Sequence, residues 1–204
     1  MRKPLATLNV LILSGLLTAY GCNDAQNQQA KNAADSVGAK IDTAVQTLKQ
    51  KADNLINSNP DSNFVVKATI GGKEEIAMLQ AGIDNGTSKE LKAHARMMLA
   101  DHKKLGEKVS AYAASKGYIL PADDNGKSAD ALAKLNQHAK GADWDKAWVD
   151  FLVDEHSDDI SMFEKAENNV KDSTLKNMIS DALPILHNHY DMVKQLQGTI
   201  TSGK

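Results

Sequence analysis

Apolar residues recur every three or four positions in four long segments of this chain, and this spacing constrains its fold more than any other feature. It places the apolar side chains along one face of an α-helix. The segments cover residues 61–84, 88–116, 143–169 and 173–198. Only 4% of the residues are aromatic, and the alternating pattern typical of strands is absent. The sequence therefore predicts an all-α fold, a four-helix bundle over residues 61–200.

The limits of these helices follow from local signals. Gly86 is expected to end the first helix in a left-handed conformation, and Ser88 to cap the second. Residues 118–142 form a longer connection, within which residues 129–139 have the pattern of a short helix. Pro184 should kink or loosen the fourth helix, because proline cannot donate a backbone hydrogen bond. Gly72 and Gly82 predict a close approach of the first helix to a neighbour.

Each apolar stripe also contains one polar residue that could bind a metal: Glu75, His102, His156 and His189. Each lies near the middle of its helix. With a rise of about 1.5 Å per residue, the four should lie within roughly 6 Å of the bundle's midpoint whether the helices run up and down or use a crossover.

Burying three imidazoles and a carboxylate is unfavourable unless they are paired, and metal coordination pairs them. This donor set suits one transition-metal ion, iron, zinc or copper, without choosing among them. The alternative is a water-bridged Glu–His network that fixes the register of the helices. Four further residues are secondary candidates as ligands or their supports: Asp159, Glu155, Asp101 and His187.

The first 21 residues resemble a bacterial lipoprotein signal peptide. Arg2 and Lys3 precede an apolar stretch at residues 5–19, which is shorter than the ~20 residues that a helix needs to cross a bilayer. The stretch leads to Gly21-Cys22, which resembles the cleavage and lipidation motif. Cys22 is the only cysteine, so lipidation explains it better than a disulfide does. The alternative is a chance cysteine after an ordinary signal peptide.

Residues 22–60 are interpreted as a tether to the membrane. Asn23 favours the outer membrane, facing the periplasm, whereas Asp24 leaves the inner membrane open. A polar spacer is followed by an amphipathic helix within residues 30–57. This additional helix either packs on the bundle or binds an envelope protein partner.

Four stretches resemble the ferritin-like domain-of-unknown-function family 4142, labelled "predicted outer membrane protein": residues 64–75 with Gly71-Gly72, residues 95–102, residues 142–145 leading to Glu155-His156, and Leu183-Pro184 followed by His189. The similarity covers about residues 63–197. It implies a ferritin-like bundle, export and a site at Glu75, His102, His156 and His189. It implies no activity. The Glu-x-x-His pairs of di-iron ferritins are missing, which disfavours a two-iron ferroxidase.

The leading functional hypothesis is a metal-binding envelope lipoprotein with little or no catalytic activity. One alternative is an interaction protein in which the histidines are structural, and another is an oxidoreductase with a single metal ion. The net charge of −2 and the mixed charge pattern argue against nucleic-acid binding. Hydrolase, kinase and metalloprotease motifs are absent.

Overall fold

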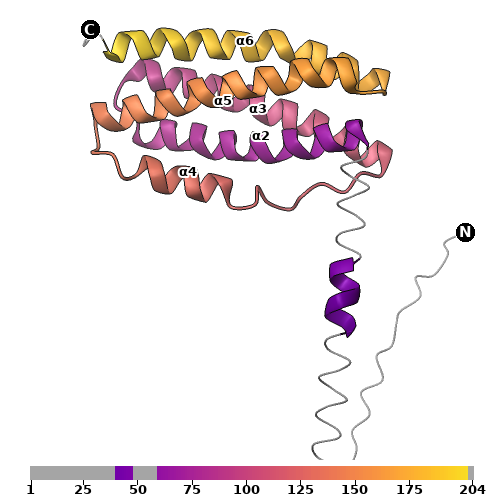
Figure 1. Ribbon diagram of the computed structural model, residues 1–204. Coiled ribbons are helices and arrows are strands. Elements are labelled where there is room, and N and C mark those ends of the chain that lie inside the picture. The colour runs from indigo at the N-terminus through magenta and orange to yellow at the C-terminus, as the bar shows by residue number, and fades with distance from the viewer. Residues whose placement is uncertain (1–39, 48–58, 202–204) are drawn as a thin grey trace, which may run out of the picture. The chain divides into compact units, whose positions relative to one another are not determined.

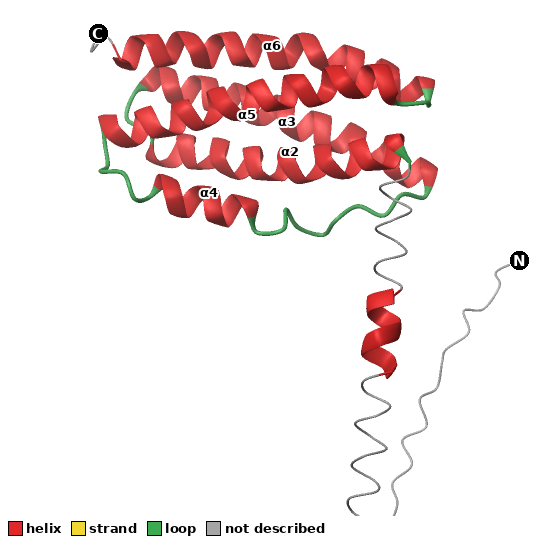
Figure 2. Cartoon of the chain, viewed as in Figure 1, coloured by secondary structure: helices red, strands yellow, loops and turns green. Residues whose placement is uncertain are grey.

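The computed structural model describes residues 40–47 and 59–201, and apart from short connections these residues are helical (Figure 2). No strand occurs among them. The chain divides into two units, Met1–Lys49 and Gln50–Lys204. In the first unit, residues 40–47 are helical, as the amphipathic pattern predicts. The signal segment, Cys22 and the rest of the tether up to residue 58 lie outside the described residues.

Two helical hairpins make up the bundle in the second unit. α2 (Pro60–Asn85) and α3 (Lys89–Lys116) form the first, and α5 (Ala142–Asn169) and α6 (Ser173–Thr201) form the second. α2 packs against α3 and α5, and α6 packs against α5 and α3. In Figure 1 each neighbouring pair runs antiparallel, because the connection from α3 returns along the bundle before α5 begins. One long crossover of this kind is the ferritin-like arrangement.

The crossover contains the short helix α4 (Lys127–Leu135), which packs against α2 and α5. It begins two residues before the predicted helix and ends four before its predicted end. Lys127 Nζ lies 3.1 Å from Glu74 Oε2 on α2, and Lys73 Nζ donates to the carbonyls of Pro121 and Ala122. These lysine contacts hold the crossover against α2.

Each hairpin turn is held by an aspartate from the other hairpin. Asp145, in the first turn of α5, accepts hydrogen bonds from the backbone N–H and the hydroxyl of Thr87 in the α2–α3 turn. Asp61, in the first turn of α2, accepts from the backbone N–H groups of Lys171 and Asp172 in the α5–α6 turn. Both carboxylates are buried. The two hairpins are therefore fixed to each other at both ends of the bundle.

The turn after α2 differs from the prediction. Ser88 caps α3 as expected, its hydroxyl accepting from the Leu91 N–H at 3.0 Å. The prediction of a left-handed Gly86 was wrong, because its φ is −54°. A Cβ on Gly86 would lie 2.6 Å from the Gly82 carbonyl oxygen and would collide with the Leu91 side chain. Glycine is required at this position because there is no room for a side chain, and not because the backbone is left-handed.

A layer of polar side chains divides the apolar core into two clusters. One cluster contains Met78, Leu79, Trp148, Leu152 and Val193 with their neighbours. The other contains Phe64, Val109, Phe163, Leu175 and Leu186 with theirs. The predicted polar residues of the four stripes lie between the two clusters. They are thus enclosed by packed side chains on both sides along the bundle axis.

Trp148 belongs to the core. Its ring is fully buried, and its Nε1 donates to the Met78 carbonyl at 2.7 Å. A Cβ on Gly82 would lie less than 3.0 Å from the Trp148 ring, which confirms the close approach predicted there. Gly72 makes no such approach, because its added Cβ would have no neighbour within 4 Å. α6 continues through Pro184.

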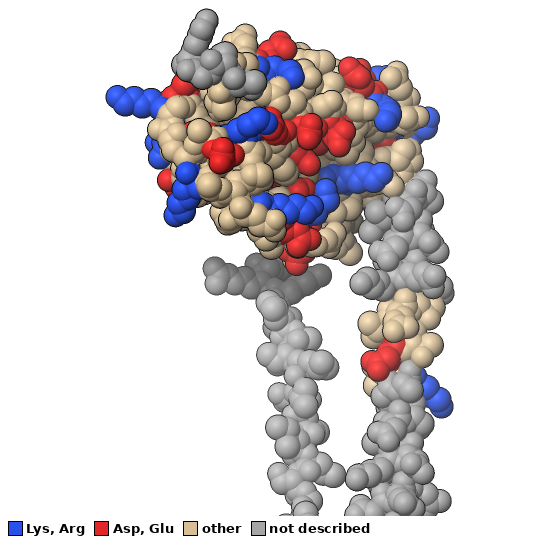
Figure 3. All heavy atoms as spheres, turned by 60° about the vertical axis from the view of Figure 1, so that its left-hand side comes forward, with Lys and Arg blue, Asp and Glu red and all other residues tan. Residues whose placement is uncertain are grey.

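The surface of the bundle is charged with both signs. On the face shown in Figure 3, acidic and basic side chains are interspersed, as the sequence pattern indicates. In the part of the chain that the structure describes, no helix is both long and apolar enough to cross a bilayer.

The two α2 glycines provide a test of this packing. Gly82→Ala should lower the free energy of unfolding by about 1–3 kcal/mol, because the added methyl group collides with Trp148. Gly72→Ala should instead raise it by about 0.5–1 kcal/mol, since alanine favours a helix interior and meets no neighbour. Urea unfolding curves measure both. Equal effects of the two substitutions would contradict the close contact of α2 with α5.

Candidate metal centre

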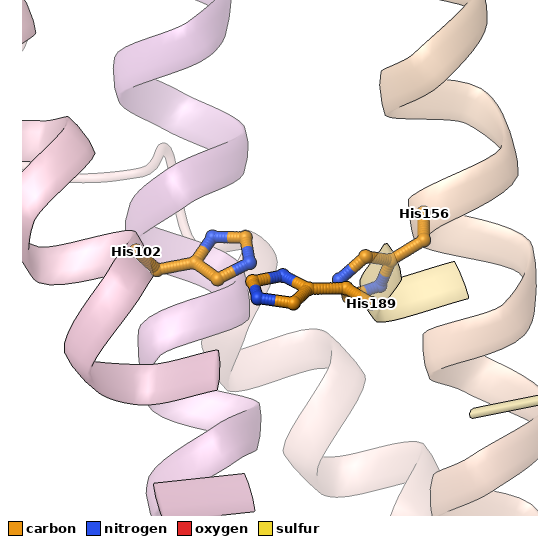
Figure 4. A group of neighbouring side chains, drawn as sticks. All are labelled: His102, His156 and His189. Carbon is orange, nitrogen blue, oxygen red and sulfur yellow. The ribbon is translucent and has the colours of Figure 1, made fainter. Parts of the chain in front are cut away.

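Glu75, His102, His156 and His189 lie together in the middle of the bundle, one from each long helix. Their exposed fractions are 1%, 4%, 0% and 1%. Figure 4 shows the three imidazole rings, which come from different helices, pointing toward one another. They lie at the same level of the core because each is near the midpoint of its helix and the four long helices pack side by side.

The three rings form a compact triangle. The distance between ring centroids is 5.5 Å for His102 and His156, 5.4 Å for His102 and His189, and 5.5 Å for His156 and His189. One ring nitrogen from each histidine lies within 4.8 Å of the corresponding nitrogens of the other two. The group is therefore small enough to surround a single ion.

One nitrogen of each ring faces an oxygen of the protein. His156 Nδ1 donates to the Leu152 carbonyl at 2.9 Å, and His189 Nε2 donates to Asp101 Oδ2 at 3.0 Å. His102 Nδ1 lies 3.1 Å from Glu75 Oε2. In His156 and His189 the accepting oxygen behind the ring fixes its orientation and places the N–H on that side. The opposite nitrogen then carries a lone pair, which is how proteins prepare histidines for metals.

The opposite nitrogens have no partner. His102 Nε2, His156 Nε2 and His189 Nδ1 are buried and make no hydrogen bond with any protein atom. A buried polar atom without a partner costs about 1–3 kcal/mol, so three together in one core are unusual. These are the nitrogens that face the middle of the triangle in Figure 4.

Glu75 lies behind two of the rings. Its Oε2 is near His102 Nδ1, and its Oε1 is 3.5 Å from His156 Nδ1. Neither contact is aligned well enough to be a hydrogen bond, so both carboxylate oxygens are buried without one. Glu75 thus faces the nitrogens opposite to those that point inward. The geometry favours it as a support for the imidazoles over its predicted place among the ligands.

Burial determines the protonation of the histidines. Loss of water lowers the pKa of His156 to about 4, although the nearby Glu75 carboxylate acts against this change. The same loss lowers the pKa of His102 and of His189, against the opposing charges of Asp159 and Asp101. All three rings are therefore neutral at pH 7, which is the form that binds metals.

Asp159 forms a carboxyl pair with Glu75. Burial, followed by the charge of nearby Glu75, raises the pKa of Asp159 to about 8. Burial also raises the pKa of Glu75. The pair accordingly keeps a proton near neutral pH. This proton leaves a single negative charge beside His102 and His156.

The secondary candidates separate into two groups. Asp101 and Asp159 belong to the cluster as neighbours of His189 and Glu75. Glu155 does not: it lines a groove beneath α4 with Glu74 and Lys127, and burial raises its pKa to about 7. His187 is exposed, and its Nε2 lies 3.8 Å from Glu164 Oε1 on the surface.

Sequence reasoning missed the Leu152 carbonyl, which orients His156. No side-chain pattern marks a backbone oxygen, although its position one helical turn before a stripe histidine is a signal that could have been used. It also missed buried Glu74, whose ion pair with Lys127 secures α4.

The carboxyl pair predicts how the stability of the metal-free protein depends on pH. A pKa that is raised on folding means that the folded state holds the proton more tightly, so stability falls as pH rises toward the folded value. Between pH 6.5 and 8 the free energy of unfolding should therefore decrease, because folded Asp159 still holds a proton that the unfolded chain has already released, and the decrease should level off above pH 8. Asp159→Asn should reduce this decrease, and Asp158→Asn, an exposed neighbour, should not. Urea unfolding at several pH values, with a chelator present, tests this. Parallel curves for Asp159→Asn and the unchanged protein would contradict the pairing.

Comparisons with known proteins identify the family. The family model described as "Domain of unknown function (DUF4142)" matches residues 45–196, which include all four long helices except the last residues of α6, and all four residues of the cluster. Searches among curated proteins and among solved structures found no match. Because the family model covers most of the sequence, as the resemblance indicated, the chain belongs to the DUF4142 family.

Proposed function

We propose that this protein binds one transition-metal ion between His102, His156 and His189, as an exported lipoprotein of the bacterial envelope. A single observation supports the metal site most strongly. Each imidazole has one nitrogen that faces a protein oxygen, through a hydrogen bond in His156 and His189, and a second, inward nitrogen without any partner. A metal ion satisfies all three inward nitrogens at once, which no hydrogen-bond donor in the surrounding apolar core does.

Small movements would complete such a site. Around a tetrahedral ion with bonds of about 2.1 Å, ligand nitrogens lie about 3.4 Å apart. The donors here lie within 4.8 Å of one another, so modest rotations of the imidazoles would close the triangle. Three protein ligands leave a fourth position for water or another molecule. Zinc, iron and copper remain the candidate ions, because imidazole suits each of them.

The charges of the residues around the site are compatible with the binding of a divalent ion. Neutral imidazoles contribute no charge, so a divalent ion would bring two positive charges into the core. The Glu75–Asp159 pair with its single proton would offset one, and Asp101 behind His189 would offset part of the other. The carboxylates behind the rings also make the imidazoles better donors.

The metal site predicts a graded series of affinities. The full-length protein, purified without a histidine tag, should bind close to one equivalent of metal. His156→Gln should abolish this binding, because two imidazoles remain. Glu75→Gln should weaken it by about 10–100-fold, the usual effect of losing a support behind a ligand. Competition with a coloured chelator measures each affinity.

His187→Gln is the matched control, since His187 lies on the same helix as His189 but is exposed on the surface. It should bind metal as the unchanged protein does. Equal, substoichiometric metal in all these proteins would exclude the metal site. The Glu75–His102 contact would then be part of a structural network. This is the outcome expected if the protein is an interaction protein of the envelope.

The proposed location depends on Cys22. Lipidation there would attach the protein to a membrane, and the following residues would place the bundle in the periplasm, with the outer membrane favoured by Asn23. The mixed charges and the absence of a spanning helix among the described residues are compatible with such an anchor.

Replacing the cysteine tests the anchor. In a Gram-negative host, the protein should be found in the membrane fraction, and mass spectrometry should find acyl chains on an N-terminal Cys22. Cys22→Ser should remove the acyl chains and release the bundle into the periplasmic fraction. Recovery of an unmodified thiol at Cys22 in the mature protein would show that the cysteine follows an ordinary signal peptide.

A further inference from the structure

A pocket between α3 and α6 reaches two of the three imidazoles. The cavity volume there is about 80 Å³, several times the roughly 10–15 Å³ that one water molecule needs, so a small molecule of a few heavy atoms fits. His102 and His189 form its floor, since both line it and both are almost fully buried. The proposed ion would therefore lie at the inner end of a pocket that opens to solvent.

The walls of this pocket are mainly apolar. Leu105, Met178, Ala182 and Leu186 line its sides, and Ile185, which is 44% exposed, lies at its mouth. An apolar wall favours a ligand with a short hydrocarbon body, because burying that body removes it from water.

The charges favour an anion at the inner end. Lys104 and Lys108 line the pocket and are exposed, while Asp181 is an opposing charge on the same pocket. Asp101 also lines it, but its carboxylate is paired with His189. With a divalent ion bound, the pocket would contain a surplus of positive charge. An anionic donor would neutralise that surplus and occupy the fourth coordination position.

We propose that the α3–α6 pocket binds a small organic monoanion, a carboxylate with a short alkyl body, whose oxygen occupies the open position of the ion. This inference rests on the proposed metal site and names the ligand class of that site. A second groove, between α2 and α3, reaches Glu75, His102 and Asp159. It contains one imidazole only, and its carboxyl pair repels an anion.

Cobalt(II) serves as a spectroscopic probe of both proposals. Full-length protein loaded with Co²⁺ should develop the visible absorption of a low-coordinate nitrogen site, and addition of sodium acetate, propionate or butyrate should shift it. Affinity should rise by about two- to fourfold for each added methylene, because each is buried against the apolar wall.

Two variants locate the ligand. Ile185→Ala should weaken butyrate binding by about threefold, because it removes part of the apolar mouth. It should leave acetate binding and the Co²⁺ affinity unchanged. Met97→Ala is the control. Met97 lies on α3 and is a partly exposed apolar residue like Ile185 on α6, but it does not line the pocket. It should alter none of these values.

The outcomes separate the two proposals. Cobalt binding without any effect of the carboxylates would overturn the pocket proposal alone. Carboxylate binding that does not depend on chain length or on Ile185 would also overturn it, because the anion would then reach the ion by another route. Failure to bind cobalt, zinc or copper at all would overturn the proposed metal site and the pocket proposal with it.

Discussion

The rest of the structure depends on one constraint, which is that a core of packed side chains contains a layer of polar groups that must be paired. Burying Glu75 and three imidazoles without partners is unfavourable. The protein meets part of this demand with the Leu152 carbonyl and Asp101, which accept hydrogen bonds from the outer nitrogens of His156 and His189. The inner nitrogens are left with nothing to bind. A metal ion at their centre is the simplest group that meets the remaining demand.

The packing of the bundle fixes the position of this layer of polar side chains. Two apolar clusters enclose it along the bundle, and the aspartates Asp61 and Asp145 fix the hairpins to each other at the two ends. The two hairpins also resemble each other, since Asp61 precedes Glu75 by the same number of residues as Asp145 precedes Asp159. The carboxyl pair of the cluster thus consists of two residues in equivalent positions of the two hairpins.

Much of this arrangement could be predicted from the spacing of residues. The stripes gave the four long helices to within a few residues, and the long connection after α3 left room for the crossover that the structure contains. The depth of Glu75, His102, His156 and His189 followed from their positions at the helix midpoints. The direction of each side chain could not be predicted in this way. The spacing of residues along a helix identifies the face on which a residue lies, but it does not identify the rotamer of its side chain. Glu75 was predicted as a ligand, and its carboxylate faces the outer nitrogens of His102 and His156. Gly86 was misjudged because glycine after a helix usually means a left-handed residue, whereas here Leu91 and the Gly82 carbonyl leave no room for a side chain.

X-ray absorption spectroscopy on the full-length protein loaded with one equivalent of zinc tests the central claim most directly. The proposed site predicts three imidazole nitrogens at about 2.0–2.1 Å and one exchangeable oxygen ligand. His102→Gln should reduce the imidazole contribution to two rings or remove the metal. A spectrum with only oxygen ligands, or one that His102→Gln leaves unchanged, would show that the ion binds elsewhere and that the cluster is structural.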